Sequence, residues 1–88
     1  MENGLEPRVH NFILERFPLA RKRSLGTGDD LLDSGILDSL GVLELVTFLE
    51  EELGVLIVDD ELVPENFSTV ERLARFAGRK MDGSGESP

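Results

Sequence analysis

The residues best suited to chemistry surround Ser39, in the run GILDSLG at positions 35–41. A serine hydroxyl at the start of a helix lies beside unpaired N–H groups and the positive end of the helix dipole, which stabilise a phosphate ester. Between Arg23 and Arg72 the chain has thirteen Asp and Glu and no Lys or Arg. Together these features predict a modified serine beside an acidic surface that basic partners recognise. The alternative is a plain helix cap formed by Asp38 or Ser39, worth about 1 kcal/mol.

A catalytic use of Ser39 is the first hypothesis to test against the sequence. The only histidine is His10, and the sequence by itself does not exclude a catalytic pair of Ser39 and His10. However, the serine lacks the first glycine of the G-x-S-x-G nucleophile elbow, and so short a chain offers little room for a substrate pocket with an oxyanion hole. We therefore expect no catalytic residue and no intrinsic enzyme activity.

The acidic loop before Ser39 raises the question of a metal site. Counted from Asp30, Gly35 occupies the sixth position of an EF-hand loop, but Leu32 and Gly41 occupy the third and twelfth, where oxygen ligands are required. The chain has no cysteine, which excludes disulfides, thiolate nucleophiles and Cys-ligated zinc. We therefore expect no metal site.

Composition limits the class of partner. The chain has 88 residues, a length typical of one domain, and a formal net charge of −9. That charge argues against nucleic acid and anionic membranes, which require clustered Lys and Arg. No apolar run reaches the roughly 20 residues of a membrane span, and the N-terminus lacks a signal peptide's pattern. We expect a monomer in the cytoplasm, steered electrostatically towards basic partners.

Periodic apolar residues predict the elements that position Ser39. Apolar residues at helical spacing predict one helix over about residues 6–17 and a second, with a more regular pattern, over 39–53. Gly54 is expected to end the second helix. Their apolar residues are Val9, Phe12, Ile13 and Phe17 in the first, and Val42, Leu45, Val46, Leu49 and Leu53 in the second. Between Pro18 and Asp38 the apolar residues show no sustained helical spacing, so we expect a long ordered loop there.

The rest of the chain is predicted to complete a helical bundle. Residues 55–58 read as an extended segment, 59–64 as a short helix, and Ser68 to Gly78 as a last helix that begins with an S-x-x-E capping box. We expect an all-α, four-helix bundle with three main helices and one short helix, occupying residues 5–78. Residues 1–4 are predicted to be a flexible N-terminus, and 79–88 a disordered tail.

The helix that begins at Ser39 should carry a second functional surface. At about 100° per residue, one exposed side gathers Leu40, Glu44, Thr47 and Glu51. A leucine flanked by carboxylates is a plausible docking stripe for basic partners, and an ordinary solvated face is the alternative.

These residues also carry a family resemblance. The runs at 32–40, 44–45 and 48–54 closely resemble the acyl carrier protein family, and Asp38-Ser39-Leu40 matches that family's attachment motif. In that family the serine receives 4′-phosphopantetheine from coenzyme A. The resemblance extends through 70–74 and covers about residues 5–78, and the family's four-helix fold agrees with the predicted bundle.

The resemblance implies a function. Ser39 would carry covalent 4′-phosphopantetheine, added by a phosphopantetheinyl transferase with its magnesium, and the arm's thiol would hold intermediates as thioesters. Asp38 and Leu40 would form the rest of the attachment motif, while Leu40, Glu44, Thr47 and Glu51 would map onto the docking face. Implied partners are the transferase, an acyl- or aminoacyl-loading ligase or acyltransferase, and a downstream transferase or synthase. Leu45, Val46 and Leu49 would line a shelter for acyl chains.

Three departures bear on the cargo. Gly41 replaces an acidic residue usual in carriers of primary fatty-acid synthesis, Val58 replaces a frequent proline, and Leu56 replaces a polar residue. Residues 61–67 instead resemble stand-alone carriers of aminoacyl transfer or specialised metabolism, including D-alanyl carrier proteins. We predict a carrier of this kind. The alternatives are a primary fatty-acid carrier and an unmodified helical interaction module.

Overall fold

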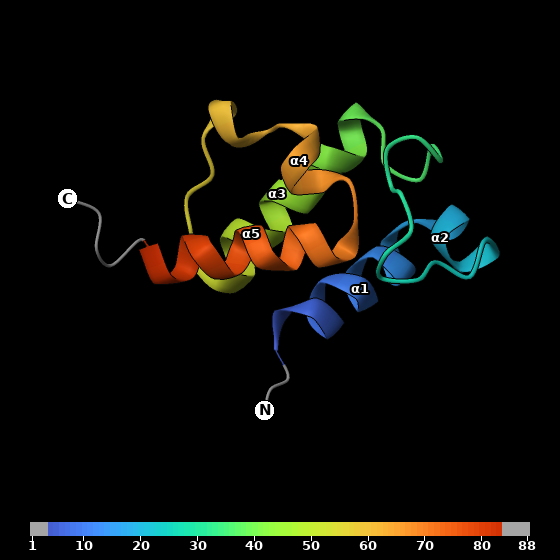
Figure 1. Ribbon diagram of the computed structural model, residues 1–88, viewed down its shortest axis with the longest axis horizontal. Coiled ribbons are helices and arrows are strands. Elements are labelled where there is room, and N and C mark those ends of the chain that lie inside the picture. The colour runs from blue at the N-terminus through green and yellow to red at the C-terminus, as the bar shows by residue number, and fades with distance from the viewer. Residues whose placement is uncertain (1–3, 84–88) are drawn as a thin grey trace.

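The computed structural model describes residues 4–83, and that part of the chain is helical, without strands. The elements are α1 (Leu5–Arg16), α2 (Pro18–Lys22), α3 (Ser39–Leu53), the 3₁₀ turn η1 (Asp59–Glu61), α4 (Pro64–Phe67) and α5 (Val70–Gly83). In Figure 1, α5 crosses in front of α3 and α1 lies below them. The predicted all-α fold is confirmed, although the short elements outnumber the one expected.

The core lies where α1, α3 and α5 meet. Their inward faces follow the predicted periods, and the loop after α2 adds further apolar residues. The buried apolar residues include Val9, Ile13, Leu31, Leu45, Leu49, Val70, Leu73 and Phe76. Burying side chains of this kind stabilises a fold by about 1.5–3 kcal/mol each, so these contacts fix how the helices lie.

Both ends of α3 are set by local chemistry. Asp38 is the N-cap, because its Oδ1 accepts a hydrogen bond of 2.8 Å from the N–H of Gly41. Gly54 ends the helix in the left-handed conformation, at φ 70°, which glycine adopts without steric cost. The helix therefore begins and ends where the sequence predicts.

The loop that leads to Ser39 is ordered by hydrogen bonds from its own backbone. The Leu31 N–H donates to the Ser68 carbonyl at 2.7 Å, and the Leu37 N–H donates to the Leu31 carbonyl at 2.9 Å. Asp30 accepts from the N–H of Asp33 at 2.6 Å, so this carboxylate caps a turn. The acidic loop residues thus help to shape the connection, which was predicted to be ordered.

Two short helices were not predicted at their places. Pro18 was expected to begin the long loop, but it begins α2, since the first helical turn tolerates a residue without an N–H. Pro64 was expected to end a short helix that starts at Asp59. Instead, η1 stops at Glu61 and Pro64 begins the separate α4.

The predicted bounds of the last helix were wrong at both ends. Ser68 follows α4 in a helical conformation, so it does not cap α5; the Thr69 hydroxyl accepts from the Arg72 N–H at 3.0 Å instead. The helix continues through Gly78 to Gly83, since Gly78 lacks the positive φ of Gly54. Residues 79–83, predicted to be a disordered tail, are therefore helical, while residues 84–88 and the N-terminal 1–3 lie outside the described part.

Candidate functional site

Ser39 is the first residue of α3 and is exposed. The N–H groups of Gly41 and Val42 donate to the side chain and the carbonyl of Asp38, at 2.8 and 2.9 Å. Asp38 is therefore the cap, and the Ser39 hydroxyl is not needed for that purpose. The first N–H groups of a helix have no partner within the helix, so the Ser39 side chain lies beside donors that favour a phosphate.

A groove of about 370 Å³ opens beside Ser39. Its walls come from the end of α1, the start of α2, the end of the loop and the first turn of α3. The lining residues are Arg16, Phe17, Pro18, Leu19, Gly35, Ile36, Asp38, Leu40, Gly41 and Glu44. Apolar side chains share this lining with the charged groups of Arg16, Asp38 and Glu44, so the groove can hold a chain with both polar and apolar parts that is attached nearby.

The first turn of α3 is packed tightly, through Gly41, against Phe17, which follows α1, and against Leu37 of the loop. A Cβ atom at this position would lie 3.0 Å from both Phe17 Cε1 and Leu37 Cδ2. Only glycine allows so close an approach without movement of those side chains. Gly41 therefore helps to set the position of Ser39, a role that the sequence did not predict.

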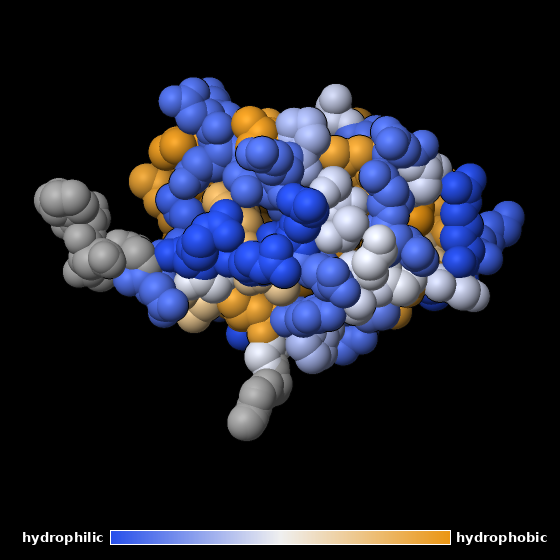
Figure 2. Space-filling model, in the orientation of Figure 1, coloured by the Kyte–Doolittle hydropathy of each residue, from blue (hydrophilic) through white to orange (hydrophobic). Residues whose placement is uncertain are grey.

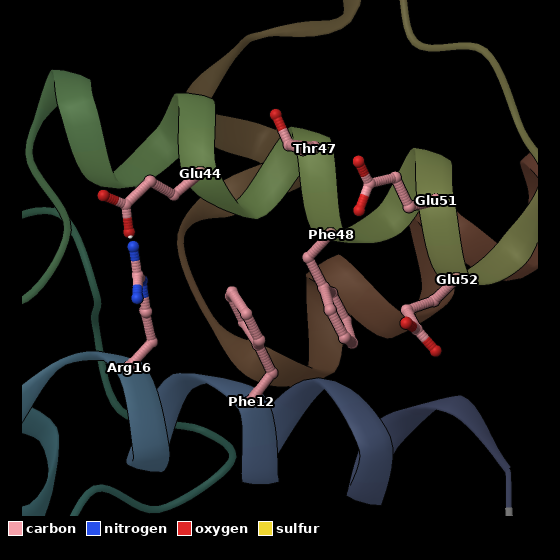
Figure 3. A pocket seen from close by; sticks show the side chains of 7 residues that line it. All are labelled: Phe12, Arg16, Glu44, Thr47, Phe48, Glu51 and Glu52. Atoms are coloured by element: carbon pink, nitrogen blue, oxygen red, sulfur yellow. Dashed lines mark hydrogen bonds and ion pairs between the residues drawn. The ribbon is translucent and has the colours of Figure 1, made fainter.

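The predicted docking residues share one side of α3. Leu40 is 71% exposed, Thr47 and Glu51 are exposed, and Glu44 is half-buried. Figure 3 shows Glu44, Thr47 and Glu51 following one another along the helix. The helical spacing thus brings the four residues together, as predicted, and we call them the α3 stripe.

The stripe borders a second groove, between α1 and α3, of about 500 Å³. The Phe12 and Phe48 rings stack there, with centroids 4.0 Å apart and planes 15° apart (Figure 3). Arg16 Nε donates to Glu44 Oε1 at 2.7 Å, and this hydrogen bond, with the charge of Glu44, raises the pKa of Arg16. This groove was not predicted from the sequence, because no local pattern reveals how two distant helices align.

The family follows from comparison with known proteins. Residues 10–77 match the family model for the phosphopantetheine attachment site. A curated relative, the probable acyl carrier protein PigG of Serratia sp. (strain ATCC 39006), is 33% identical over 75 residues, which are 85% of this chain and 86% of the relative. The chain belongs to the acyl carrier protein family. Its cofactor is therefore covalently attached 4′-phosphopantetheine, and this carrier interacts with a phosphopantetheinyl transferase and with acyl-handling enzymes.

The residues present in this carrier fit that cofactor. An exposed hydroxyl, the start of a helix and a groove with polar and apolar walls occur together at the start of α3. The residues expected to shelter an acyl chain lie elsewhere: Leu45 and Leu49 are fully buried in the core and Val46 is half-buried. The two grooves beside the stripe are lined by other side chains.

Acyl carrier proteins are not catalysts, and this carrier's histidine has another contact. His10 Nε2 lies 2.8 Å from the Leu25 carbonyl oxygen, which joins α1 to the loop. Within residues 4–83, no group of three His, Asp or Glu side chains is arranged to hold a metal ion. None of the helices in that range is long and apolar enough to cross a bilayer.

Proposed function

We propose that Ser39 carries the 4′-phosphopantetheine of this carrier, and that the protein shuttles acyl or aminoacyl groups between partner enzymes as a stand-alone carrier. The observation that supports Ser39 most strongly is its position: an exposed hydroxyl at the first residue of α3, with Asp38 already serving as the cap. This leaves the hydroxyl available to a transferase.

The proposed role of each residue follows from its surroundings. The Ser39 oxygen forms a bond to the phosphorus that carries the pantetheine of coenzyme A, the P–O bond of the pyrophosphate breaks, and adenosine 3′,5′-bisphosphate leaves. The hydroxyl proton passes to a base of the transferase. Asp38 orients the first turn of α3 through Gly41. Leu40 and the rest of the α3 stripe contact the partner enzymes. When attached, the cofactor supplies a thiol that holds the cargo as a thioester.

For the cargo we propose an aminoacyl group or an intermediate of specialised metabolism. The support is the departure at Gly41: carriers of primary fatty-acid synthesis usually have an acidic residue there, whereas here a buried glycine packs against Phe17 and Leu37. A malonyl transferase and an adenylating ligase, each supplied with the modified protein, distinguish the two cargo classes. Loading by the ligase alone supports the proposal, whereas loading by the malonyl transferase alone identifies a fatty-acid carrier.

The attachment site is tested by intact mass after incubation with coenzyme A, magnesium and a broad-specificity transferase. We expect the native chain to gain one phosphopantetheine and Ser39→Ala to gain none. Ser34→Ala is the matched control, since this serine lies in the same connection, five positions earlier, and it should be modified like the native chain.

The other outcomes assign the function differently. Modification of Ser39→Ala would move the attachment to another residue. A folded native chain that gains no mass would overturn the attachment proposal and favour an interaction module that works through the α3 stripe alone.

A further inference from the structure

Three arginines form a continuous stripe on the outer face of α5. Arg72, Arg75 and Arg79 are spaced i, i+3 and i+7, which places them on one side of the helix, and all three are exposed. They line one groove of about 180 Å³ together with Glu65 and Asn66 of α4. We call these three residues the α5 arginine stripe.

The carrier itself does not use the charges of this stripe. Among the described residues, Arg8, Arg16 and Lys80 form ion pairs with Glu52, Glu44 and Glu61, and Arg21 and Arg23 donate to backbone carbonyls. No such side-chain contact within residues 4–83 involves an arginine of the stripe. Glu65 brings the one carboxylate that lines this groove, and Arg75 also borders a neighbouring groove with Glu6 and Glu71, but none of these carboxylates forms an ion pair with the stripe in the described part of the chain.

The helix that carries the stripe, α5, lies on a different side of the molecule from α3. In Figure 1, α5 is nearer the viewer than α3, whereas in Figure 3 α3 is in front. Figure 2, in the orientation of Figure 1, shows strongly hydrophilic side chains over α5. α3 carries four Glu and no Lys or Arg, whereas α5 carries four Lys and Arg against one Glu and one Asp. The two helices therefore present opposite charges.

We propose that the α5 arginine stripe is a second docking surface, which binds an acidic surface of a partner protein. Arginine forms bidentate hydrogen bonds with carboxylates, and a row of three on one helix matches carboxylates arranged along a partner's helix or strand. A partner bound there leaves Ser39 and the α3 stripe accessible. The carrier could then stay attached to one protein while an enzyme that recognises α3 acts on its cargo.

The overall charge favours a compact acidic protein surface over other anions. At physiological salt, charges act over about 8 Å, so a small carboxylate patch interacts mainly with the stripe. A nucleic acid or an anionic membrane extends further and also meets the acidic faces of a protein with net charge −9. The acidic α3 face of a second copy is also complementary in charge to the α5 arginine stripe. However, that contact would be head-to-tail, so it would leave one free face at each end and would not give a closed dimer.

The test uses a short labelled peptide that alternates Glu and Ala, with binding followed by fluorescence anisotropy at low salt. We expect R72Q/R75Q/R79Q to weaken binding by about tenfold or more, since each exposed ion pair contributes modestly. For a single matched change, Arg75→Gln is compared with Lys22→Gln, which removes the same charge from exposed α2. Only Arg75→Gln should weaken binding. In NMR spectra of the isotope-labelled carrier, the amide chemical shifts that change on addition of the peptide should lie along α5.

The remaining outcomes overturn the proposal. They are equal weakening by Lys22→Gln, amide shifts confined to α3, or no measurable binding of the peptide. Tighter binding of a single-stranded oligonucleotide or of anionic vesicles through the same arginines would identify another class of ligand. Stripe-dependent self-association in sedimentation would identify a second copy. Ser39→Ala should bind the peptide normally, so this test is independent of the attachment proposal.

Discussion

Arg16 Nε lies 2.7 Å from Glu44 Oε1, and these two residues line both of the grooves that follow α3. The pair therefore stands between the groove beside Ser39 and the groove over the stacked phenylalanines. It also means that one carboxylate of the α3 stripe already has a positive partner within the carrier. A basic enzyme that docks at Glu44 must compete with Arg16.

The first prediction concerns this competition. Arg16→Gln should speed association with the phosphopantetheinyl transferase by about twofold to threefold at low salt, because it releases Glu44 and adds to the attractive field. Arg8→Gln is the matched control: Arg8 also pairs with a glutamate of α3, Glu52, at 3.3 Å, but Glu52 lies off the stripe. Stopped-flow association rates measure the effect. Equal acceleration by both variants would show that net charge, and not the Arg16–Glu44 pair, controls the rate.

The second prediction distinguishes the two carboxylates of the stripe. Glu51→Lys should slow association more than Glu44→Lys, by about threefold to tenfold at low salt, since no positive side chain of the carrier pairs with Glu51 in the described structure. Added salt should slow the native protein and reduce the difference between the variants. Glu65→Lys on α4 carries the same change in charge away from the stripe. Association rates that do not depend on salt would refute electrostatic docking.

Some of this arrangement could be predicted from sequence because its causes are local. Both ends of α3 were predicted correctly, since Asp38 and Gly54 act on residues within one turn. The α3 stripe follows from helical spacing alone. By contrast, the Arg16–Glu44 pair and the stacked Phe12 and Phe48 depend on how α1 aligns with a helix more than twenty residues later. No local pattern carries that information.

The wrong end of α5 has a similar explanation. A glycine after an apolar periodic run is a frequent helix stop, and Gly54 is one, but Gly78 is not. Glycine costs a helix about 1 kcal/mol relative to alanine, and tertiary contacts can offset that cost. Phe76 and Ala77 are buried beside it, and Lys80, two residues later, pairs with Glu61. These distant contacts favour the helix beyond Gly78.

The third prediction concerns pH. Burial by itself raises the pKa of Glu61, but the hydrogen bond from the Val58 N–H, and then that from Lys80 with its charge, bring the pKa below the ordinary 4.5. A carboxyl with a lower pKa in the folded state stabilises the fold above its unfolded pKa, and the effect disappears as pH falls through the folded pKa. Glu61→Gln should therefore be less stable than the native protein at neutral pH, with a difference that shrinks below about pH 4.5.

Urea unfolding at a series of pH values measures this difference. Lys80→Gln is the informative control, because it keeps the Val58 hydrogen bond and removes only the ion pair. It should lose part of the pH-dependent stability that Glu61→Gln loses. A stability difference between Glu61→Gln and the native protein that stays constant from neutral to acidic pH would contradict this account.

The last prediction compares two helical glycines. Gly41→Ala should lower the free energy of unfolding by up to about 2 kcal/mol, because overpacking against Phe17 and Leu37 costs about 1–3 kcal/mol and offsets the helix-propensity gain of about 1 kcal/mol. At Gly78 a Cβ would lie 3.7 Å from the nearest Leu5 atom, an ordinary contact, so Gly78→Ala should stabilise by about 0.5–1 kcal/mol. Urea unfolding measures both. Stabilisation by Gly41→Ala would show that the first turn of α3 moves freely, and that close packing against α1 does not hold Ser39 in place.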